Sequence, residues 1–389
     1  MNILILTRSF GIGGVSIVSS ILANKFKQEG HSVTIWAFFE SDTSSSDRLI
    51  EGISLIYSHG FKLCKENTEN LRKVLKERHI DIIINQWGLP YIPIITARKA
   101  SKGLNVKIIS VYHNAPASNG KIQSVEMILS RCDNPMAKMA LNCKKWFWTL
   151  ITSMSMRYVY NKSDLYLVLS ESFIEEFKRF THLRQTKHLK VQTNPITINV
   201  SGFVYSQAAK EKEIIFVGRL DEIQKRISRI ISTWNHLEKR FPDWRLTIIG
   251  DGPDRQYLED MVRTLGLERV NFDGFQSPLE YYKRSSLLML TSDFEGFGLV
   301  VTEAMSFGVV SVVYNSYAAA GDLIDDGKNG VLLPFHKEGY DAEEAAIVMS
   351  KLMTDDVHRN ELAEAALVKS QKFSLDRIYN EWMEKIENL

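Results

Sequence analysis

The chain has 389 residues, 44% of them hydrophobic and 24% charged, with 48 basic and 46 acidic side chains and a formal net charge of +2. This near balance argues against a protein built mainly to neutralise a nucleic-acid backbone. The cysteines Cys64, Cys132 and Cys143 lack Cys-x-x-Cys spacing, so they support neither a disulfide framework nor a zinc site and fit a reducing compartment. A chain of this length exceeds one ordinary core, and we expect two domains.

The first half alternates short apolar runs with helical patterns. A continuous apolar run is typical of a strand that is buried on both faces, as strands of parallel sheets are. The runs therefore predict a parallel sheet. The runs are residues 3–6, 33–37, 82–84, 106–111 and 165–169. Between the first two runs, apolar residues recur at helical spacing up to Gly30, where a helix C-cap is expected, so this segment is a βαβ unit. We therefore assign residues 1–195 to an α/β, Rossmann-like domain.

The N-terminal segment is predicted to be this first strand, because no basic region or small-residue cleavage site precedes its glycines. No run approaches the roughly 18 apolar residues that a helix needs to cross a bilayer. We expect a cytoplasmic protein that is able to lie on the inner face of a membrane but not to span it.

Residues 121–162 carry many basic side chains, with only Glu126 and Asp133 opposing them, and Trp146, Phe147 and Trp148 lie among them. This mixture suits an interfacial helix on anionic lipid. A partly buried helix with solvated lysines is an equal alternative, and nucleic-acid binding is disfavoured. The basic residues are Lys121, Arg131, Lys138, Lys144, Lys145, Arg157 and Lys162.

A second set of apolar runs follows Asn194-Pro195, where proline disfavours helix in its predecessor and the next residues resemble a linker. The runs are residues 214–217, 246–249, 270–272, 287–290, 309–313 and 331–333. They predict a second Rossmann-like domain over residues 196–375 and a final helix over residues 376–389. Because ligands of such folds bind at the carboxyl ends of the strands, we expect the two domains to face each other across a cleft.

The segment LTSDFEGFGLVVTEAMSFG, residues 290–308, reads as a strand, a glycine-containing loop and a helix. Glu295 falls in the loop and Glu303 about two turns into the helix, so the two carboxylates would reach different parts of one ligand. Free backbone amides at the helix start favour a diphosphate. The alternative is a surface turn with two solvated glutamates. The amides belong to Gly296, Phe297, Gly298 and Leu299.

The segment FVGRLDEIQKR, residues 216–226, is again a strand that runs into a loop before a helix. Arg219 and Lys225 are placed to bind one ligand, and fixed cations stabilise a departing diphosphate without a metal. Simple solvation is the alternative for such loop residues, and it is our interpretation of Arg226 and Arg229. We expect no metal ion, because no Asp-x-Asp motif follows a strand.

Glycines in two further places fit a nucleotide site. In IIGDGP, residues 248–253, Gly250 and Gly252 would allow a ligand to approach the backbone. In VNFDGF, Gly274 shows a similar pattern that is weaker still. Each signal is weak by itself, since glycines after strands are often only turns.

Together these segments resemble the retaining glycosyltransferases of family 4, which have the GT-B fold. The resemblance covers most of the chain and is most specific over residues 216–333, where GRLDEIQK, IGDGP, EGFGLVVTEAM and DDGKNGVLL follow in the family's order. It implies that Glu295 contacts the hydroxyls of the donor sugar and Glu303 the ribose. It also implies that Arg219 and Lys225 bind the diphosphate.

The resemblance also extends to the first half, which it makes the acceptor side. GIGGV, residues 11–15, resembles the family's glycine loop, which implies that Gly14 contacts the donor. His113 in VYHNAP resembles the family's histidine near the reacting sugar, although a single histidine at a strand end is often structural. The pattern of Ile378, Trp382 and Ile386 resembles the last helix of the family, which packs on the first domain. One departure is Ser16, where many members have an acidic residue.

The activity implied is transfer of a sugar from a nucleoside-diphosphate sugar to an acceptor hydroxyl, with retention of configuration, in glycan or polysaccharide synthesis on a lipid-linked acceptor. A sugar-nucleotide epimerase or a phosphorylase on the same fold is one alternative. A non-catalytic subunit that binds a nucleotide sugar or a glycan is another, which the loss of the acidic residue at Ser16 would favour. The motifs do not specify the donor base, the sugar or the acceptor.

Overall fold

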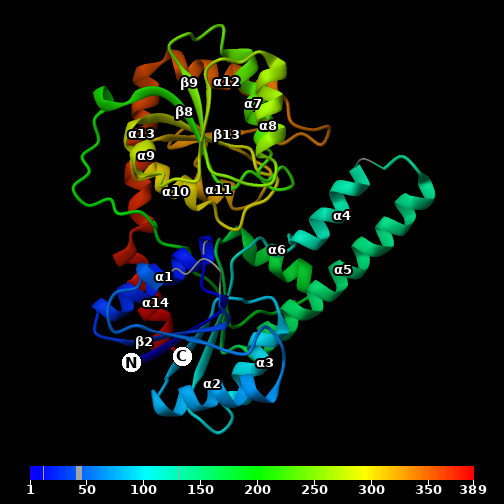
Figure 1. The fold of residues 1–389 in the computed structure, drawn as a ribbon, viewed down its shortest axis with the longest axis vertical. Coiled ribbons are helices and arrows are strands. Elements are labelled where there is room, and N and C mark those ends of the chain that lie inside the picture. The colour runs from blue at the N-terminus through cyan, green and yellow to red at the C-terminus, as the bar shows by residue number, and fades with distance from the viewer. Residues whose placement is uncertain (12, 41–45, 131) are drawn as a thin grey trace. The chain divides into compact units, whose positions relative to one another are not determined.

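The computed structural model describes residues 1–11, 13–40, 46–130 and 132–389. The chain divides into two compact units: the first unit comprises residues 1–197 with 375–389, and the second comprises residues 198–374. Each unit holds one parallel sheet flanked by helices (Figure 1). The predicted α/β class with two Rossmann-like domains is therefore confirmed. The predicted boundary at residue 195 lies two residues before the division.

The first unit contains a seven-stranded parallel sheet in the order β3-β2-β1-β4-β5-β6-β7. Its strands are β1 (Asn2–Ser9), β2 (Ser32–Phe39), β3 (Ser54–Tyr57), β4 (Ile82–Asn85), β5 (Lys107–Tyr112), β6 (Leu165–Val168) and β7 (Leu189–Val191). Its helices are α1 (Gly14–Gln28), α2 (Lys65–Glu77), α3 (Tyr91–Ala100), α4 (Gly120–Ser130), α5 (Pro135–Lys162), α6 (Ser172–Thr181) and α14 (Leu375–Glu387). The sequence did not predict the short edge strands β3 and β7, because neither has a fully buried apolar run.

The second unit contains a six-stranded parallel sheet in the order β10-β9-β8-β11-β12-β13. Its strands are β8 (Glu211–Val217), β9 (Arg245–Ile249), β10 (Val270–Gly274), β11 (Ser285–Leu290), β12 (Val310–Tyr314) and β13 (Gly330–Leu333). Its helices are α7 (Ile227–Leu237), α8 (Arg255–Leu265), α9 (Leu279–Arg284), α10 (Leu299–Met305), α11 (Ala320–Leu323), α12 (Ala342–Thr354) and α13 (Asp356–Ser370). The strand order reverses between β8 and β11, where folds of this kind bind ligands.

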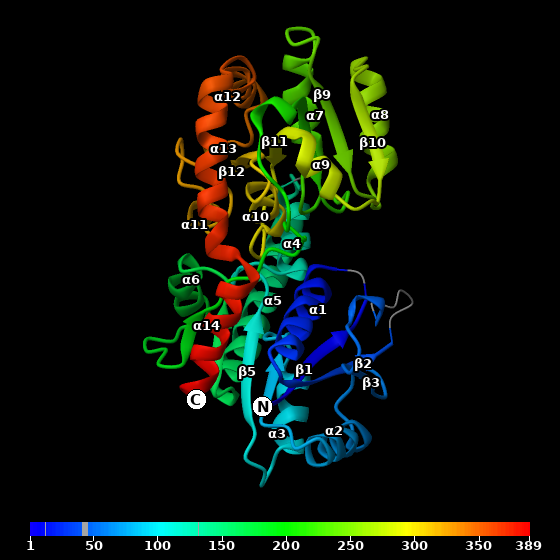
Figure 2. The ribbon, with the colours of Figure 1, turned by 90° about the vertical axis from the view of Figure 1, so that its left-hand side faces the viewer.

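Helix α14 completes the core of the first unit by packing on α1 (Figure 2). Its side chains Ile378, Trp382 and Ile386 are buried, and Trp382 meets Phe26 of α1 edge-on at a centroid distance of 6.4 Å. Residues spaced by four along a helix share one face, so this pattern produces a single apolar stripe.

Helices α4 and α5 form an antiparallel pair, with Lys145 Nζ of α5 2.8 Å from Glu126 Oε1 of α4. The Asn134 side chain accepts hydrogen bonds from the amides of Met136 and Ala137 and so caps α5, which starts at Pro135. Within the described residues, no helix combines the length and the apolar character needed to cross a membrane.

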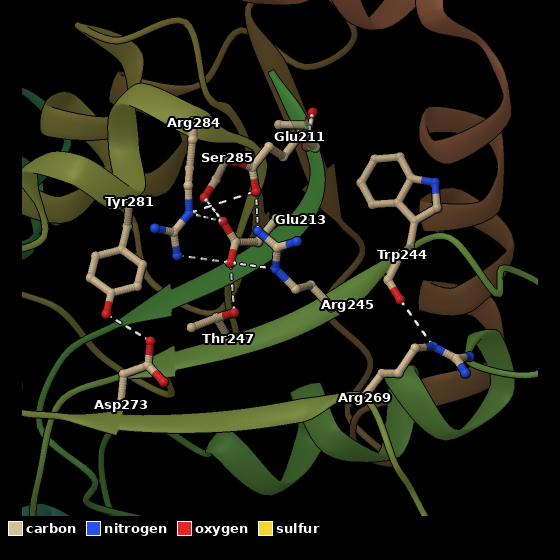
Figure 3. A network of polar contacts seen from close by, with 11 residues as sticks. Glu211, Glu213, Trp244, Arg245, Thr247, Arg269, Asp273, Tyr281, Arg284 and Ser285 are labelled. Carbon is tan, nitrogen blue, oxygen red and sulfur yellow. Dashed lines mark hydrogen bonds and ion pairs between the residues drawn. The ribbon is translucent and has the colours of Figure 1, made fainter. Parts of the chain in front are cut away.

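The amino ends of three neighbouring strands of the second unit meet at the buried carboxylate of Glu213 on β8 (Figure 3). Arg245 and Thr247 of β9 donate to its Oε1 at 2.9 and 2.7 Å. Arg284 Nε and Ser285 Oγ donate to its Oε2 at 2.9 and 2.8 Å. Both oxygens are thus fully engaged, which ties β8 to its two neighbours.

Candidate functional site

At the opposite, carboxyl edge of this sheet, the loops after β8 and β11 lie side by side. The Asp293 amide donates to the Gln224 carbonyl at 2.8 Å, and the Gln224 side chain donates to the Phe294 carbonyl at 3.1 Å. β8 and β11 are adjacent in the sheet, so residues 219–226 and 291–298 come together although about 70 positions separate them in sequence. This edge holds most of the predicted ligand-binding residues.

Lys225 and Glu295 form a buried ion pair in these loops. Lys225 Nζ lies 2.5 Å from Glu295 Oε1, and the side chains are only 14% and 8% exposed. Ser292 Oγ donates to the same oxygen at 2.6 Å. Among the residues that the structure describes, no hydrogen bond reaches Oε2 of Glu295. The carboxylate therefore keeps one oxygen available for a further partner.

Arg219 follows β8 on the same edge and differs from Lys225 in its surroundings. Its side chain is exposed, and it forms no ion pair or hydrogen bond within the described part of the chain. This edge therefore carries two cations: Lys225, which is paired with Glu295, and Arg219, which is available to an anionic ligand.

Arg226 and Arg229 are not merely solvated, so our interpretation of these two residues is wrong. Arg226 Nε and Arg229 Nη1 each lie 2.6 Å from an oxygen of Asp293, and the two side chains are about four-fifths buried. Arg226 adopts a left-handed backbone with φ 51° immediately before α7. These arginines hold the two loops together, because one carboxylate on the second loop bridges both.

Gly250 and Gly252 are required by the packing of two loops. A Cβ atom on Gly250 would overlap the Gly218 carbonyl, and one on Gly252 would overlap the Leu220 carbonyl. The loops are also hydrogen-bonded, since the Gly218 and Leu220 amides donate at 3.0 Å to the carbonyls of Ile249 and Asp251. This close approach of backbone explains the motif IIGDGP without a ligand, and the assignment to donor binding stays a prediction.

Glu303 lies in a shorter helix than the sequence predicted. Helix α10 has seven residues and starts at Leu299, so Glu303 is its fifth residue rather than two turns inside it. Its side chain is buried, and its Oε2 accepts a hydrogen bond from Tyr282 at 3.0 Å. Burial, together with the neighbouring Glu303 carboxylate, raises the pKa of Tyr282 well above its usual value, so this hydroxyl remains a donor.

The loop before α10 offers backbone rather than side chains. Phe297 is buried and packs edge-on against Phe373 at a centroid distance of 5.6 Å. Gly298 has φ 90°, a left-handed conformation that favours glycine, and the helix begins directly after it. Of the residues 296–299, we therefore expect only main-chain groups to meet a ligand.

Tyr317, after β12, belongs to the same region and was missed in the sequence. Its hydroxyl is buried and has no hydrogen-bond partner among the described residues. A Cβ atom built on Gly298 would lie 3.4 Å from this hydroxyl. A tyrosine in a loop belongs to none of the motifs, so only its position in the fold could have revealed it.

In the first unit, His113 lies just past the end of β5 and pairs with Gln86, which follows β4. The two side chains are joined by a contact of 2.6 Å between His113 Nε2 and Gln86 Oε1. Burial lowers the pKa of His113 to about 4, so the ring is neutral at neutral pH. Gln86 is buried, and the sequence had not indicated it.

The glycine loop after β1 leads into α1, whose first residue is Gly14. Ile12 of this loop lies outside the described residues. The hydroxyl of Ser16 accepts a hydrogen bond from the Gly11 amide at 3.3 Å, so this side chain supports the loop itself. Gly14 and His113 lie at the carboxyl edge of the same sheet. Their contacts with a ligand stay predictions.

Two family profiles match the chain, and they follow the two units. The profile described as Glycosyltransferase Family 4 matches residues 12–198, and the profile described as Glycosyl transferases group 1 matches residues 201–368. The division between the units, after residue 197, falls one residue before the end of the first match.

Individual relatives agree with these profiles. The enzyme GalNAc-alpha-(1->4)-GalNAc-alpha-(1->3)-diNAcBac-PP-undecaprenol alpha-1,4-N-acetyl-D-galactosaminyltransferase of Campylobacter jejuni is 28% identical over 319 residues, 81% of this chain and 77% of that enzyme. An uncharacterised glycosyltransferase of Haemophilus influenzae is 30% identical over 175 residues, 44% of this chain and 48% of that protein. The match thus spans about half the length of the second relative.

Among solved structures, HepE of Anabaena in complex with UDP and glucose has a TM-score of 0.74, with 18% identity and full coverage of both chains. Identity at this level shows a common fold alone. Since the two profiles together span nearly all of both units, the chain belongs to the family 4 glycosyltransferases and has their GT-B fold.

Proposed function

We propose that the protein transfers a sugar from a nucleoside-diphosphate sugar to an acceptor hydroxyl, with retention of configuration and without a metal ion. The observation that carries the proposal is the pair of Lys225 and Glu295, 2.5 Å apart at the carboxyl edge of the second sheet. Arg219 follows the same strand as Lys225 and is exposed, with no ion pair to any described residue. Cations there suit a diphosphate, and a carboxylate with a free oxygen suits sugar hydroxyls.

Each residue then has a chemical task. As the bond between sugar and diphosphate breaks, negative charge grows on the leaving group, and Arg219 and Lys225 stabilise it. The main-chain amides of residues 296–299 donate to the same phosphates. Glu295 accepts hydrogen bonds from the transferred sugar, and Glu303 accepts them from the ribose. Gly250 and Gly252 shape the nucleotide side of the site.

The acceptor side is assigned to the first unit. We propose that the loop at Gly14 and the neutral imidazole of His113 lie near the reacting sugar. A neutral ring both accepts and donates hydrogen bonds, which suits contact with hydroxyl groups. Burial keeps the pKa of His113 at about 4 and so maintains that state across the physiological range.

The first experiment is a binding and product assay. HepE was solved with UDP and glucose, so UDP-sugars are the first donors to try, with GDP- and ADP-sugars beside them. A ligand at 100 times its dissociation constant adds about 2.7 kcal/mol of stability, which raises the melting temperature. NMR of the product gives the anomeric configuration, and addition of EDTA tests metal dependence. Inverted product or loss of activity in EDTA would contradict the proposal.

We further propose a lipid-linked acceptor, reached by a protein that sits peripherally on the cytoplasmic face of an anionic membrane. Helix α5 supports this with a row of exposed apolar side chains next to Lys138, Lys144 and Lys145. Basic and apolar groups together favour binding to anionic bilayers. Arg131 lies outside the described residues. The exposed apolar side chains are Met136, Met139, Trp146, Phe147, Leu150, Ile151 and Met154.

Sedimentation with vesicles tests this surface. We expect binding to anionic vesicles that weakens with salt, and less binding after Trp146→Glu. Phe275→Glu is a matched control, since Phe275 of the second unit and Trp146 are both 67% exposed. Equal, negligible binding to neutral and anionic vesicles would instead favour a helix with solvated lysines.

A further inference from the structure

Among the residues that the structure describes, Tyr317 has the one tyrosine hydroxyl that is buried without a hydrogen-bond partner. Tyr282 donates to Glu303 at 3.0 Å, Tyr281 donates to Asp273 at 2.7 Å, and Tyr340 meets Thr233 at 2.8 Å. The Tyr317 residue is 6% exposed, yet its hydroxyl has no partner in the part of the chain that the structure describes. Leaving a buried hydroxyl unpaired is unfavourable, so such a group calls for a specific explanation.

The surroundings of this hydroxyl connect it to the candidate donor site. A Cβ atom built on Gly298 would lie 3.4 Å from the hydroxyl and 3.3 Å from Leu323 Cδ1, so the hydroxyl lies beside the loop that carries Glu295. Burial, with the field of the Glu295 carboxylate second, raises the pKa of Tyr317 well above its usual value. The hydroxyl is therefore a permanent donor within electrostatic reach of Glu295.

The ion pair of Lys225 and Glu295 explains why a second hydrogen-bond donor near the carboxylate would be useful. Both contacts of the carboxylate, from Lys225 and Ser292, fall on Oε1. In the proposed function Lys225 also binds the diphosphate, and a single ammonium group then serves two anions. When the ion pair of a buried carboxylate is weakened, the carboxylate needs another hydrogen bond to remain ionised and oriented.

We propose that Tyr317 is a positioning residue that donates its hydroxyl to the Glu295 carboxylate when a donor diphosphate draws Lys225 away. The inference rests on the proposed function and deepens it. The donor substrate exchanges one partner of Glu295 for another, so in the donor complex Glu295 stays oriented toward the sugar only while Tyr317 is in place.

The test is a double-mutant cycle of Tyr317→Phe and Glu295→Gln. Tyr317→Phe removes only an unpaired hydroxyl, so the melting temperature of the ligand-free protein stays the same or rises. We expect UDP affinity and kcat to fall by about tenfold each, the scale of one hydrogen bond to a charged group. In the Glu295→Gln background the same change has little effect, because a neutral amide does not need the donor.

Tyr340→Phe is the matched control, since its hydroxyl is paired with Thr233 in the same unit. It lowers the melting temperature and leaves UDP affinity unchanged. Additive effects in the cycle, or unchanged UDP affinity and kcat in Tyr317→Phe, would overturn the inference while leaving the proposed function intact. A wild-type protein that binds no nucleoside diphosphate would overturn the proposed function, and this inference with it.

Discussion

Two buried glutamates at opposite ends of the second sheet have contrasting surroundings. At the amino end, Glu213 accepts five hydrogen bonds of 2.7 to 3.3 Å, three on Oε1 and two on Oε2. At the carboxyl end, the two contacts that Glu295 makes with other described residues fall on one oxygen. A carboxylate whose acceptor capacity is fully used within the protein serves the fold, whereas one with capacity left is suited to a ligand.

The pKa of Glu213 reflects this difference. Burial opposes ionisation, but hydrogen bonds from Arg284, Arg245, Thr247 and Ser285 outweigh it and lower the pKa to about 2 (Figure 3). The charge is therefore fixed at any physiological pH. Comparing the two glutamates in parallel experiments separates structural from functional burial.

The largest expected effect is on turnover in Glu295→Gln. Hydrogen bonds that strengthen as the sugar becomes cation-like act on the transition state, and their loss costs roughly ten- to a thousandfold in kcat, up to about 4 kcal/mol. UDP affinity should not fall and should rise if Lys225 is released from its ion pair. Calorimetry and steady-state kinetics measure both. A variant with wild-type kcat would remove Glu295 from the site.

The next effect is on stability in Glu213→Gln. The substitution leaves Arg245 and Arg284 without a counter-charge, and breaking a buried pair costs roughly 3 to 5 kcal/mol, reduced here because both arginines are more than a third exposed. Urea unfolding should show a loss of about 2 kcal/mol. The folded fraction should bind UDP normally. Reduced UDP affinity at full folding would mean that the two ends of the sheet are coupled.

The two cations should differ in a similar way. Arg219→Ala and Lys225→Ala should each weaken UDP binding by roughly 1.5 to 3 kcal/mol, because a charge-assisted contact is lost. Only Lys225→Ala should also lower the melting temperature, because it leaves the buried Glu295 carboxylate without its ion-pair partner. Thermal melts beside calorimetry decide this. Unchanged affinity in both variants would exclude them from the site.

The last expected effect is the pH dependence of stability. The folded pKa of Glu213 is about 2 and its ordinary value 4.5, so its contribution is fully present above pH 4.5 and is lost as the pH falls toward 2. One such group changes stability by at most about 1.4 kcal/mol per pH unit. Wild type should lose more stability than Glu213→Gln between these pH values. Parallel curves for the two proteins would contradict the low pKa.

The sequence predicted the parts of this molecule that depend on local pattern. Buried strands such as β1 and β8 are continuous apolar runs, and the loops with Lys225 and Glu295 follow such runs directly. The ion pair between those two residues could not be predicted, because it depends on which strands are neighbours. The same holds for Tyr317, whose significance lies in a missing partner.

Other errors have equally local causes. Arg226 and Arg229 were interpreted as solvated, but both form ion pairs with Asp293 in the neighbouring loop. A contact between two loops leaves no periodic pattern in the sequence, so it could not be predicted. Gly250 and Gly252 are predicted to let a ligand approach the backbone, and the groups that approach them in the structure are the carbonyls of Gly218 and Leu220. A glycine pattern specifies that something comes near, and the fold decides what that is.

The return of α14 to the first unit has a consequence for synthesis on the ribosome. The N-terminal 197 residues emerge long before Trp382, which packs against Phe26 of α1. That face of α1 therefore stays open to solvent, and to any chaperone, until residues 375–389 have left the exit tunnel. Translation that stops after residue 374 would leave a molecule whose second unit is complete and whose first unit lacks α14, so that this face of α1 remains uncovered.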